Sequence, residues 1–389
     1  MNLTTLNLAL TLLLALAALV WVIGGGRALR GIYRMPRLSD FPPLPEVDCP
    51  TVSILVTARD EAAKLPQAIA TLLALDYPRL EIVAIDDRSK DATGKILDEA
   101  AARDPRVKVV HVTELPAGWL GKNHGLQTAY EHSSGEWLLF TDADVRFDPD
   151  VLRCTLALAR ARSADHVCLL SLIELKGFWE NVMVSYFILG FLLNIQPWEA
   201  ENPRSPYYVG IGAFQLVRRS VYEAVGTHRR LALEVVDDIK LGKMVKHGGY
   251  RSVCAQAFDN LRVRWQEGAS NVIKGLTKNA FASLNFNSLR TVLSVAAIGM
   301  LSVLPFAALF FATGWARLFA AVAVLAVLIL HAGAARNAHL SPLNALTHPL
   351  GAILFAYILV RSTVVTLGRG GVVWRDTFYS LDDLRKGIV

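Results

Sequence analysis

The stretch Trp137-Leu138-Leu139-Phe140-Thr141-Asp142-Ala143-Asp144 decides the fold, because a short apolar run ends abruptly in two acids. An apolar run of this length, bounded by turn-forming residues, is typical of a buried strand. Two carboxylates at positions i and i+2 of a turn can both reach one hard cation, which takes oxygen ligands. The stretch therefore predicts a strand that ends in a candidate site for a divalent ion.

Similar short β-branched runs precede this stretch at 52–56, 80–85 and 107–110, and helix-like stretches at 62–75 and 94–103 separate them. Strands that alternate with helices of this length predict βαβ units and an α/β fold with a mostly parallel sheet. Such sheets bind ligands at the carboxyl ends of their strands. Polar residues just after each strand are therefore where chemistry is expected.

Three acidic pairs occupy such places. They are Asp86-Asp87 after the second run, Asp142 with Asp144, and Asp237-Asp238 after the strand-like Val235-Val236, opening a helix over 239–247. A single pair is often only a turn former or a helix N-cap. Like charges at a strand end are nevertheless costly unless a cation or ligand compensates them. Mg²⁺ or Mn²⁺ on Asp142 and Asp144 would stabilise a diphosphate leaving group.

Membrane segments are indicated by the composition, with 53% hydrophobic and only 19% charged residues, unevenly spread over 389 positions. Each expected span is apolar and about as long as the roughly 20 residues that cross a bilayer. The expected spans are Leu3–Ile23, Thr291–Thr313, Leu318–Ala335 and, with His348, Pro349 and Arg361 inside it, Leu343–Leu367. The stretch 177–197 is also apolar, and we expect it to be an interfacial helix.

The arginines that come after the first span predict its orientation: Arg27, Arg30, Arg34 and Arg37. A cleaved signal peptide would need basic residues before the apolar run, and Met1-Asn2-Leu3-Thr4 has none. The positive-inside rule then places the residues downstream of this span in the cytoplasm. We expect a multi-pass protein of the cell's inner membrane. The side of the C-terminal tail stays open, because strict alternation places it outside whereas its basic residues favour the inside.

Two classes of function are disfavoured by charge and cysteine content. The net charge is +6 and no basic run is interleaved with aromatic residues, so we expect no nucleic-acid partner. The four cysteines are scattered without CxxC spacing, which argues against a disulfide framework or a zinc site. His111, His124 and His132 surround Lys122 without metal-ligand spacing, and we interpret them as surface or loop residues.

Taken in order, the motifs resemble the membrane-bound branch of the family 2 glycosyltransferases. That branch, inverting enzymes with a GT-A fold, acts on lipids and includes ceramide glucosyltransferase-like, carotenoid-associated and hopanoid-associated enzymes. The resemblance covers roughly residues 50–285. The matching segments are Ala58-Arg59-Asp60-Glu61, Asp86 to Asp91, Gly118 to Asn123, Phe140 to Asp144, Gly212-Ala213-Phe214, Asp237-Asp238 and Arg262 to Trp265.

The resemblance implies the donor contacts. Asp60, Asp86 and Asp87 would line the nucleoside pocket, and Lys122 would be a further contact to the donor. Arg264 and Trp265 resemble the end of a Gln-x-x-Arg-Trp motif, in which the arginine would pair with the diphosphate.

The resemblance also implies the catalytic groups. Asp142 and Asp144 would form the metal-binding DxD motif for Mg²⁺ or Mn²⁺, and Asp238 would be the general base. As base, Asp238 would remove the acceptor hydroxyl proton while the oxygen attacks the anomeric carbon from the face opposite the nucleotide.

This sequence departs from the family pattern at three positions. Asp60 stands where asparagine is usual, Asp237 where glutamate is usual, and Leu261 where glutamine or arginine is expected. The last departure weakens the likeness to processive polysaccharide synthases, which use that residue near the growing chain. It favours a single transfer.

We therefore expect a hexosyltransferase that moves a sugar from a nucleotide-diphosphate sugar to a lipid acceptor, forming a glycolipid at the cytoplasmic membrane face. We expect UDP ahead of GDP, although no motif distinguishes them. A polysaccharide synthase and a non-catalytic nucleotide-binding membrane protein are the alternatives. The expected segments are an N-terminal span (1–26), a linker (27–50), a GT-A domain (51–285), a C-terminal transmembrane bundle (286–367) and a tail (368–389).

Overall fold

The computed structural model describes residues 3–389, so the first two residues of the expected N-terminal span lie outside it. The chain forms two compact units, which are described separately. The α/β unit comprises residues 35–174, 197–265 and 382–389. The helical unit comprises the described residues through Arg34, together with 175–196 and 266–381.

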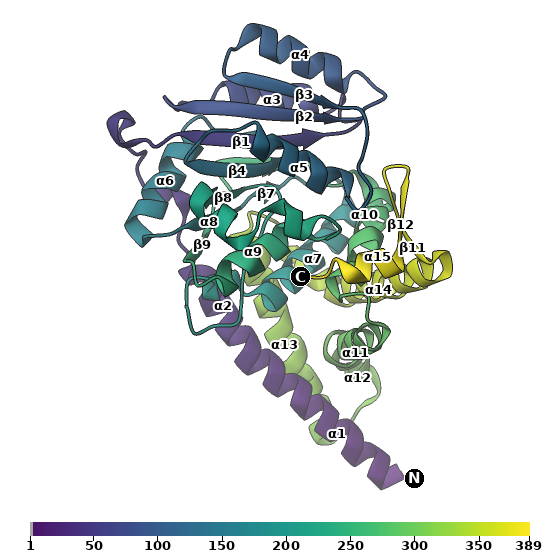
Figure 1. Ribbon diagram of the computed structural model, residues 1–389. Helices are drawn as coiled ribbons and strands as arrows, with labels where there is room; N and C mark the ends of the chain where they lie inside the picture. The colour runs from purple at the N-terminus through teal and green to yellow at the C-terminus, as the bar shows by residue number, and fades with distance from the viewer. Residues whose placement is uncertain (1–2) are drawn as a thin grey trace. The chain divides into compact units, whose positions relative to one another are not determined.

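A seven-stranded sheet forms the centre of the α/β unit, in the order β3-β2-β1-β4-β8-β6-β9 (Figure 1). Strand β8 runs antiparallel to both of its neighbours, and the other pairings are parallel. The mostly parallel α/β fold predicted from the sequence is thus confirmed. The strands are β1 Val52–Ala58, β2 Leu80–Asp87, β3 Val107–Val112, β4 Trp137–Asp142, β6 His166–Leu170, β8 Gln215–Arg218 and β9 Ser252–Gln256.

Successive side chains along each strand point to opposite faces of this sheet, and helices cover both faces. Ile54 and Leu139 point to one face, where they pack with three helices, α3 Leu65–Leu73, α4 Thr93–Arg103 and α6 Val151–Arg162. Leu55 and Phe140 point to the other face, which is covered by α5 Gly121–Glu131, α8 Arg219–Val225 and α9 Asp237–His247. A side-chain period of two, with both faces buried, explains why the strands read as continuous apolar runs.

The strand order reverses between β1 and β4, and this is the place where open α/β sheets bind ligands. Thr57, near the end of β1, is in register with Asp142 at the end of β4, and Ala58 is in register with Asp86 of β2. The carboxyl ends of three strands therefore bring the predicted acids to one edge. The strand-like pair Val235-Val236 is not a strand: these residues form a turn that leads directly into α9.

A second sheet of three short strands, β5-β10-β7, completes the unit. Its strands are β5 Val145–Phe147, β7 Leu172–Ile173 and β10 Leu261–Val263. Because β5 follows Asp144 and β10 precedes Arg264, this sheet joins the DxD turn to the Arg264-Trp265 pair. Leu261 is fully buried in the core of the unit.

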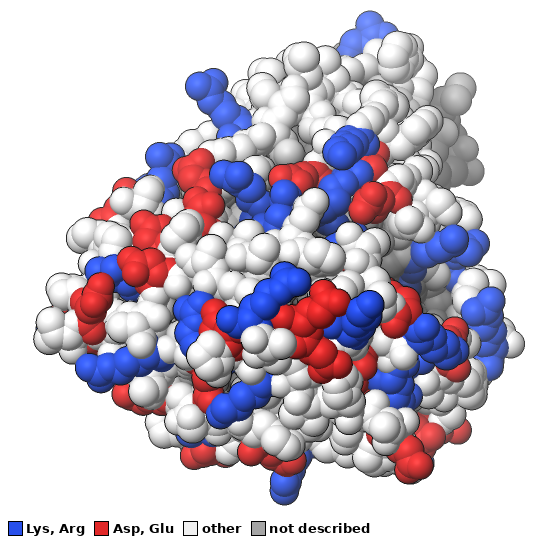
Figure 2. Space-filling model, turned by 90° about the horizontal axis from the view of Figure 1, so that it is seen from above, with Lys and Arg blue, Asp and Glu red and all other residues white. Residues whose placement is uncertain are grey.

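Figure 2 shows acidic and basic side chains interleaved on the face that it presents. Many charged groups of the α/β unit form ion pairs, such as Lys95 with Glu99 and Arg106 with Asp104. Exposed pairs such as Lys95 with Glu99 contribute little to stability.

Among the described residues, five helical stretches are long and apolar enough to cross a membrane: 5–34, 178–199, 288–311, 314–337 and 342–369. Each expected span overlaps one of these stretches. The helices of the helical unit are α1 Leu3–Leu19, α2 Gly25–Arg34, α7 Phe178–Ile195, α10 Gly268–Ser283, α11 Ser288–Ile298, α12 Leu304–Phe311, α13 Gly314–Asn337 and α14 His348–Arg369. A hairpin of β11 Gly371–Trp374 and β12 Thr377–Ser380 follows, and then α15 Leu381–Lys386.

Small residues and hydrogen bonds hold the helical unit together. Ala308, Ala316 and Ala320 pack around Leu14 of α1. The Trp21 indole N–H donates to the carbonyl of Leu301 at 2.8 Å. Close backbone approach at small residues and interhelical hydrogen bonds are the usual means of association between apolar helices.

The two compact units do not follow the boundaries drawn from the sequence. Helices α7 and α10 group with the apolar helices, although both lie within the expected GT-A domain at 51–285. Both pack against α14, which accounts for the grouping. The functional domain boundaries, and the expectation that α7 lies in the membrane interface, remain predictions.

Candidate active site

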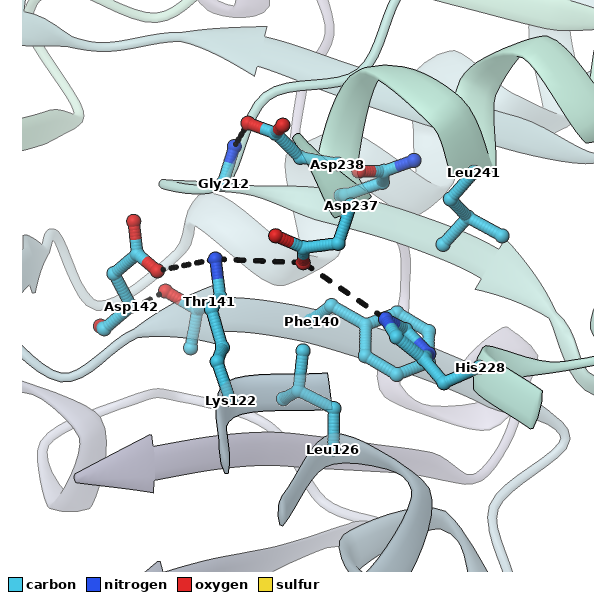
Figure 3. A pocket seen from close by; sticks show the side chains of 11 residues that line it. Lys122, Leu126, Phe140, Thr141, Asp142, Gly212, His228, Asp237, Asp238 and Leu241 are labelled. Carbon is cyan, nitrogen blue, oxygen red and sulfur yellow. Dashed lines mark hydrogen bonds and ion pairs between the residues drawn. The ribbon is translucent and has the colours of Figure 1, made fainter. Parts of the chain in front are cut away.

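A small cavity in the α/β unit lies where β4, β8 and α9 meet (Figure 3). Its walls join charged groups with apolar side chains from the core of the unit. The lining residues are Lys122, Leu126, Phe140, Thr141, Asp142, Gly212, Gln215, His228, Asp237, Asp238 and Leu241. Three residues singled out from the sequence, Lys122, Asp142 and Asp238, thus line one cavity.

Lys122, in the first turn of α5, lies between two carboxylates. Its Nζ is 3.0 Å from Asp142 Oδ1 and 3.5 Å from Asp237 Oδ2. Burial alone would lower the pKa of Lys122, but the surrounding carboxylates outweigh it and raise that pKa. The ammonium group is therefore charged and links the end of β4 to the start of α9.

Asp238 is held by two backbone N–H donors. Gly212 donates to its Oδ2 at 2.9 Å, and Ile239 donates to its Oδ1 at 2.8 Å. Burial and the negative charge of Asp237 raise the pKa of Asp238. A raised pKa makes a carboxylate a stronger proton acceptor, as a general base requires.

Gly212 lies between Asp238 and the DxD turn. A Cβ atom at this position would be 2.9 Å from Asp142 Oδ2 and 3.3 Å from Asp238 Oδ2. The two carboxylates therefore converge on one point, and only a residue without a side chain leaves that point open.

Asp237 belongs to a buried polar chain that continues through His228 to Tyr222. Its Oδ2 is 3.9 Å from His228 Nε2, and His228 Nδ1 is 2.7 Å from the hydroxyl of Tyr222. Burial opposes ionisation of Asp237, but the Lys122 ammonium prevails and lowers the pKa of Asp237. Asp237 is thus a fixed negative charge beside Asp238, and the environment separates the roles of two adjacent acids.

Asp144, the second acid of the DxD turn, pairs with a lysine that the sequence did not single out. Lys64 Nζ is 3.1 Å from Asp144 Oδ2 and donates to the carbonyl of Arg264 at 2.9 Å. Arg264 directs its guanidinium to the carbonyl of Glu174 at 2.7 Å, and Trp265 packs against the core. The structure thus joins Arg264 to the DxD turn through Lys64.

The three acids expected to bind the nucleoside lie after β1 and at the end of β2. Asp60 adopts a left-handed backbone conformation (φ 53°), and its Oδ1 accepts from the N–H of Lys90 at 2.7 Å. Asp86 Oδ1 accepts from the N–H of Ser89 at 3.3 Å. Asp87 is buried and makes two hydrogen bonds with Arg88. Strained backbone of this kind is frequent at ligand sites.

His111 is exposed, as expected of a surface residue, but it also takes part in ion pairs. It belongs to β3, and its two ring nitrogens each lie 3.0 Å from a carboxylate, Nδ1 from Asp86 and Nε2 from Asp98. These contacts raise the pKa of His111. The sequence spacing of Asp86 and His111 does not predict their contact, because it arises from the pairing of β2 with β3.

The oxygen donors of the DxD turn fit a hard divalent cation, which such carboxylates prefer. Within residues 3–389, no group of three or more His, Cys, Asp or Glu residues is arranged to hold a metal. Mg²⁺ sites commonly use one or two carboxylates and complete their shell with substrate phosphates and water. Asp142 and Asp144 match that pattern.

The sequence alone did not indicate three groups that belong to this site: Lys64, His228 and the backbone of Gly212. Lys64 meets Asp144 and Arg264 across 80 and 200 positions of sequence. Gly212 belongs to one of the family motifs, but nothing in that motif indicated its hydrogen bond to Asp238.

Comparison with known proteins agrees with this geometry. Residues 53–226 match the model of glycosyl transferase family 2. A β-monoglucosyldiacylglycerol synthase of Synechocystis sp. is 32% identical over 143 residues, which is 35% of this chain and 29% of that protein. A 4,4'-diaponeurosporenoate glycosyltransferase of Staphylococcus haemolyticus is 24% identical over 239 residues, 59% of this chain and 60% of that protein. The matches thus span less than two thirds of these relatives.

Among solved structures, a mannosyltransferase of Pyrobaculum calidifontis in complex with GDP-Man and Mn²⁺ has a similar fold. Its TM-score is 0.53 at 20% identity, over 91% of this chain and 99% of that one. The strand order, the acids at the sheet edge and the family match agree. Residues 53–226 thus match the glycosyl transferase family 2 model, and the α/β unit has a GT-A-like fold.

Proposed function

We propose that this chain is a glycosyltransferase that moves a sugar, with inversion, from a nucleotide-diphosphate sugar to a lipid acceptor at the cytoplasmic face of a membrane. The observation that carries the proposal is the convergence of Asp142 and Asp238 on the point left open by Gly212. A group that handles the leaving diphosphate and a group that accepts a proton are both needed at one reacting centre.

In this proposal Asp238 is the general base. Its carboxylate takes the acceptor hydroxyl proton while the oxygen bonds to the anomeric carbon and the bond to the diphosphate breaks. Lys122 and Asp237 keep the charge around Asp238 fixed. When bound at Asp142 and Asp144, a divalent cation would neutralise negative charge on the leaving group.

On the donor side, Asp60, Asp86 and Asp87 are assigned to the nucleoside. Arg264 is assigned to the diphosphate, and Trp265 follows Arg264 in the same donor-binding motif. Asp60 follows β1, which flanks the point where the strand order reverses, and Asp86 and Asp87 end the neighbouring strand β2; this supports the assignment. Arg264 is joined to the DxD turn through Lys64.

A lipid acceptor is favoured by the five apolar helices and by the relatives named for diacylglycerol and carotenoid substrates. A polysaccharide synthase is the weaker candidate. The side chain of Leu261 is buried in the core of the α/β unit, so it offers no polar group to a growing chain.

The test supplies purified full-length protein with native membrane lipid extract and radiolabelled UDP- and GDP-sugars, with and without Mn²⁺. A labelled product that partitions into organic solvent and requires the metal is the expected result, and it identifies the donor. Label in insoluble polymer would favour the synthase. Label that stays in the nucleotide sugar would favour a protein that binds nucleotide without transfer.

A further inference from the structure

Each carboxylate of the DxD turn is in contact with a lysine ammonium. Asp142 contacts Lys122 at 3.0 Å, and Asp144 contacts Lys64 at 3.1 Å. A metal ion that binds through these oxygens must therefore compete with cations supplied by the protein itself. The two lysines do not compete equally, because their surroundings differ.

Lys122 is anchored independently of Asp142. A second carboxylate, that of Asp237, lies 3.5 Å from its Nζ and is 6% exposed. If the Asp142 carboxylate turns to a metal ion, Lys122 keeps this buried partner. The geometry makes Lys122 a fixed part of the site.

Lys64 is placed to move. It precedes α3, its side chain is 29% exposed, and its ammonium also donates to the backbone carbonyl of Arg264 at 2.9 Å. When the ammonium leaves Asp144, this neutral carbonyl still accepts its hydrogen bond. The Asp144 side chain is 17% exposed, so the ion pair is screened less than one at the open surface.

We propose that Lys64 is an internal counter-ion that occupies Asp144 in the donor-free enzyme and must release it before a divalent cation binds. Lys64 therefore sets the metal affinity of the DxD turn. It also protects the site from metal until the donor arrives, because a diphosphate adds oxygen ligands for the ion and offers the displaced ammonium a new anionic partner. This inference rests on the proposed function, in which Asp144 holds the metal.

The test measures Mn²⁺ binding, not activity. Full-length protein in detergent is titrated with Mn²⁺ in the absence of nucleotide, and free Mn²⁺ is followed by electron paramagnetic resonance. Lys64→Met should bind Mn²⁺ about 3- to 10-fold more tightly than wild type, the range expected for loss of one partly exposed competing charge. Lys64→Arg, which keeps the charge, should stay close to wild type.

Lys95→Met is the matched control, because Lys95 also pairs with an acid, Glu99, but on the exposed surface of α4. It should leave Mn²⁺ affinity unchanged. Asp144→Asn should weaken binding strongly. If Lys64→Met destabilises the protein, Lys64→Gln provides a second neutral variant at the same position.

The inference would be overturned if both neutral variants bound Mn²⁺ as weakly as wild type or more weakly. Failure of the proposed function looks different. The lysine variants would then tighten Mn²⁺ binding as expected while no labelled sugar reached lipid in the transfer assay.

Discussion

The backbone N–H of Gly212 donates to Oδ2 of Asp238 at 2.9 Å, while its Cα faces Oδ2 of Asp142 so closely that a Cβ would lie 2.9 Å away. One residue thus spaces the candidate base from the DxD turn. Gly212→Ala should displace one or both carboxylates by a few tenths of an ångström. We expect transfer to fall by about 10- to 100-fold, because small misplacements of reacting groups are costly.

Gly190→Ala in α7 is the control, since no atom would lie within 4 Å of its new Cβ. Initial rates at saturating donor, with thermal unfolding to check the fold, decide the matter. A Gly212→Ala enzyme with the wild-type rate would show that the spacing is unimportant.

Asp238→Asn should lower transfer by about 10²- to 10⁴-fold, the usual contribution of a general base. The single amide oxygen can accept from only one of the two N–H groups, that of Gly212 or that of Ile239, so thermal unfolding should accompany the rate measurement to check the fold. Donor affinity measured by calorimetry should change little. Asp76→Asn, at an exposed carboxylate paired with Arg153, should be active. Substantial turnover by Asp238→Asn would disprove the base assignment.

Tyr222→Phe should destabilise the α/β unit by about 1 to 3 kcal/mol, because it leaves buried groups of His228 without a partner. The Tyr222 hydroxyl bonds the His228 ring at 2.7 Å and accepts from its backbone N–H at 2.9 Å. Tyr250→Phe alters a half-buried tyrosine that packs against the same cluster, and it should cost less than about 0.5 kcal/mol. Chemical unfolding of the full-length protein in detergent compares them, and equal costs would contradict the prediction.

His111 should make stability depend on pH. Hydrogen bonds to Asp86 and Asp98 raise its pKa above the ordinary 6.5. A raised pKa means that the folded state favours protonated His111. This stabilisation is complete below the ordinary pKa and disappears as pH rises through the raised value. The difference in apparent Tm between wild type and His111→Gln should therefore shrink as pH rises above the ordinary pKa of 6.5.

His132→Gln is the control for that series, because the His132 ring contacts only a backbone carbonyl, that of Thr128. At low pH its difference from wild type should be smaller than that of His111→Gln. A His111→Gln difference that grows with pH would reverse the sign and exclude the interpretation.

The orientation of the α/β unit is open to a labelling experiment. All four native cysteines are buried, so they give little background with a maleimide reagent. Lys95→Cys introduces a thiol at a side chain that is 79% exposed. If the unit faces the cytoplasm, a membrane-impermeant maleimide should label this variant only after the cells are opened. Labelling in intact cells would place the unit outside.

The strands and the acids that come after them could be predicted because their signals are local. The run 52–56 extends to Ala58 in the structure, and 80–85 extends to Asp87, so both of these predicted strands are present and only their ends were predicted too short. The pair Val235-Val236 resembled a strand but forms a turn, because two apolar residues are too few to distinguish a strand from a buried turn.

The lysine at Asp144 could not be predicted, since no local pattern encodes a contact across 80 positions. Asp142 and Asp238 could each be predicted as site residues, but the sequence could not predict that one glycine separates them in space. It depends on where the loop before β8 passes α9. A close approach of this kind is a property of packing and not of sequence spacing.

The position of β8 has a consequence for synthesis. This strand lies between β4 and β6, yet it follows α7 in the chain. While the ribosome is producing residues 178–195, the first four strands can already pair, whereas β6 has no neighbouring strand to join. Because the second half of the sheet can form only after α7 has been made, the apolar helix is exposed to water in the meantime unless the bilayer or a chaperone covers it.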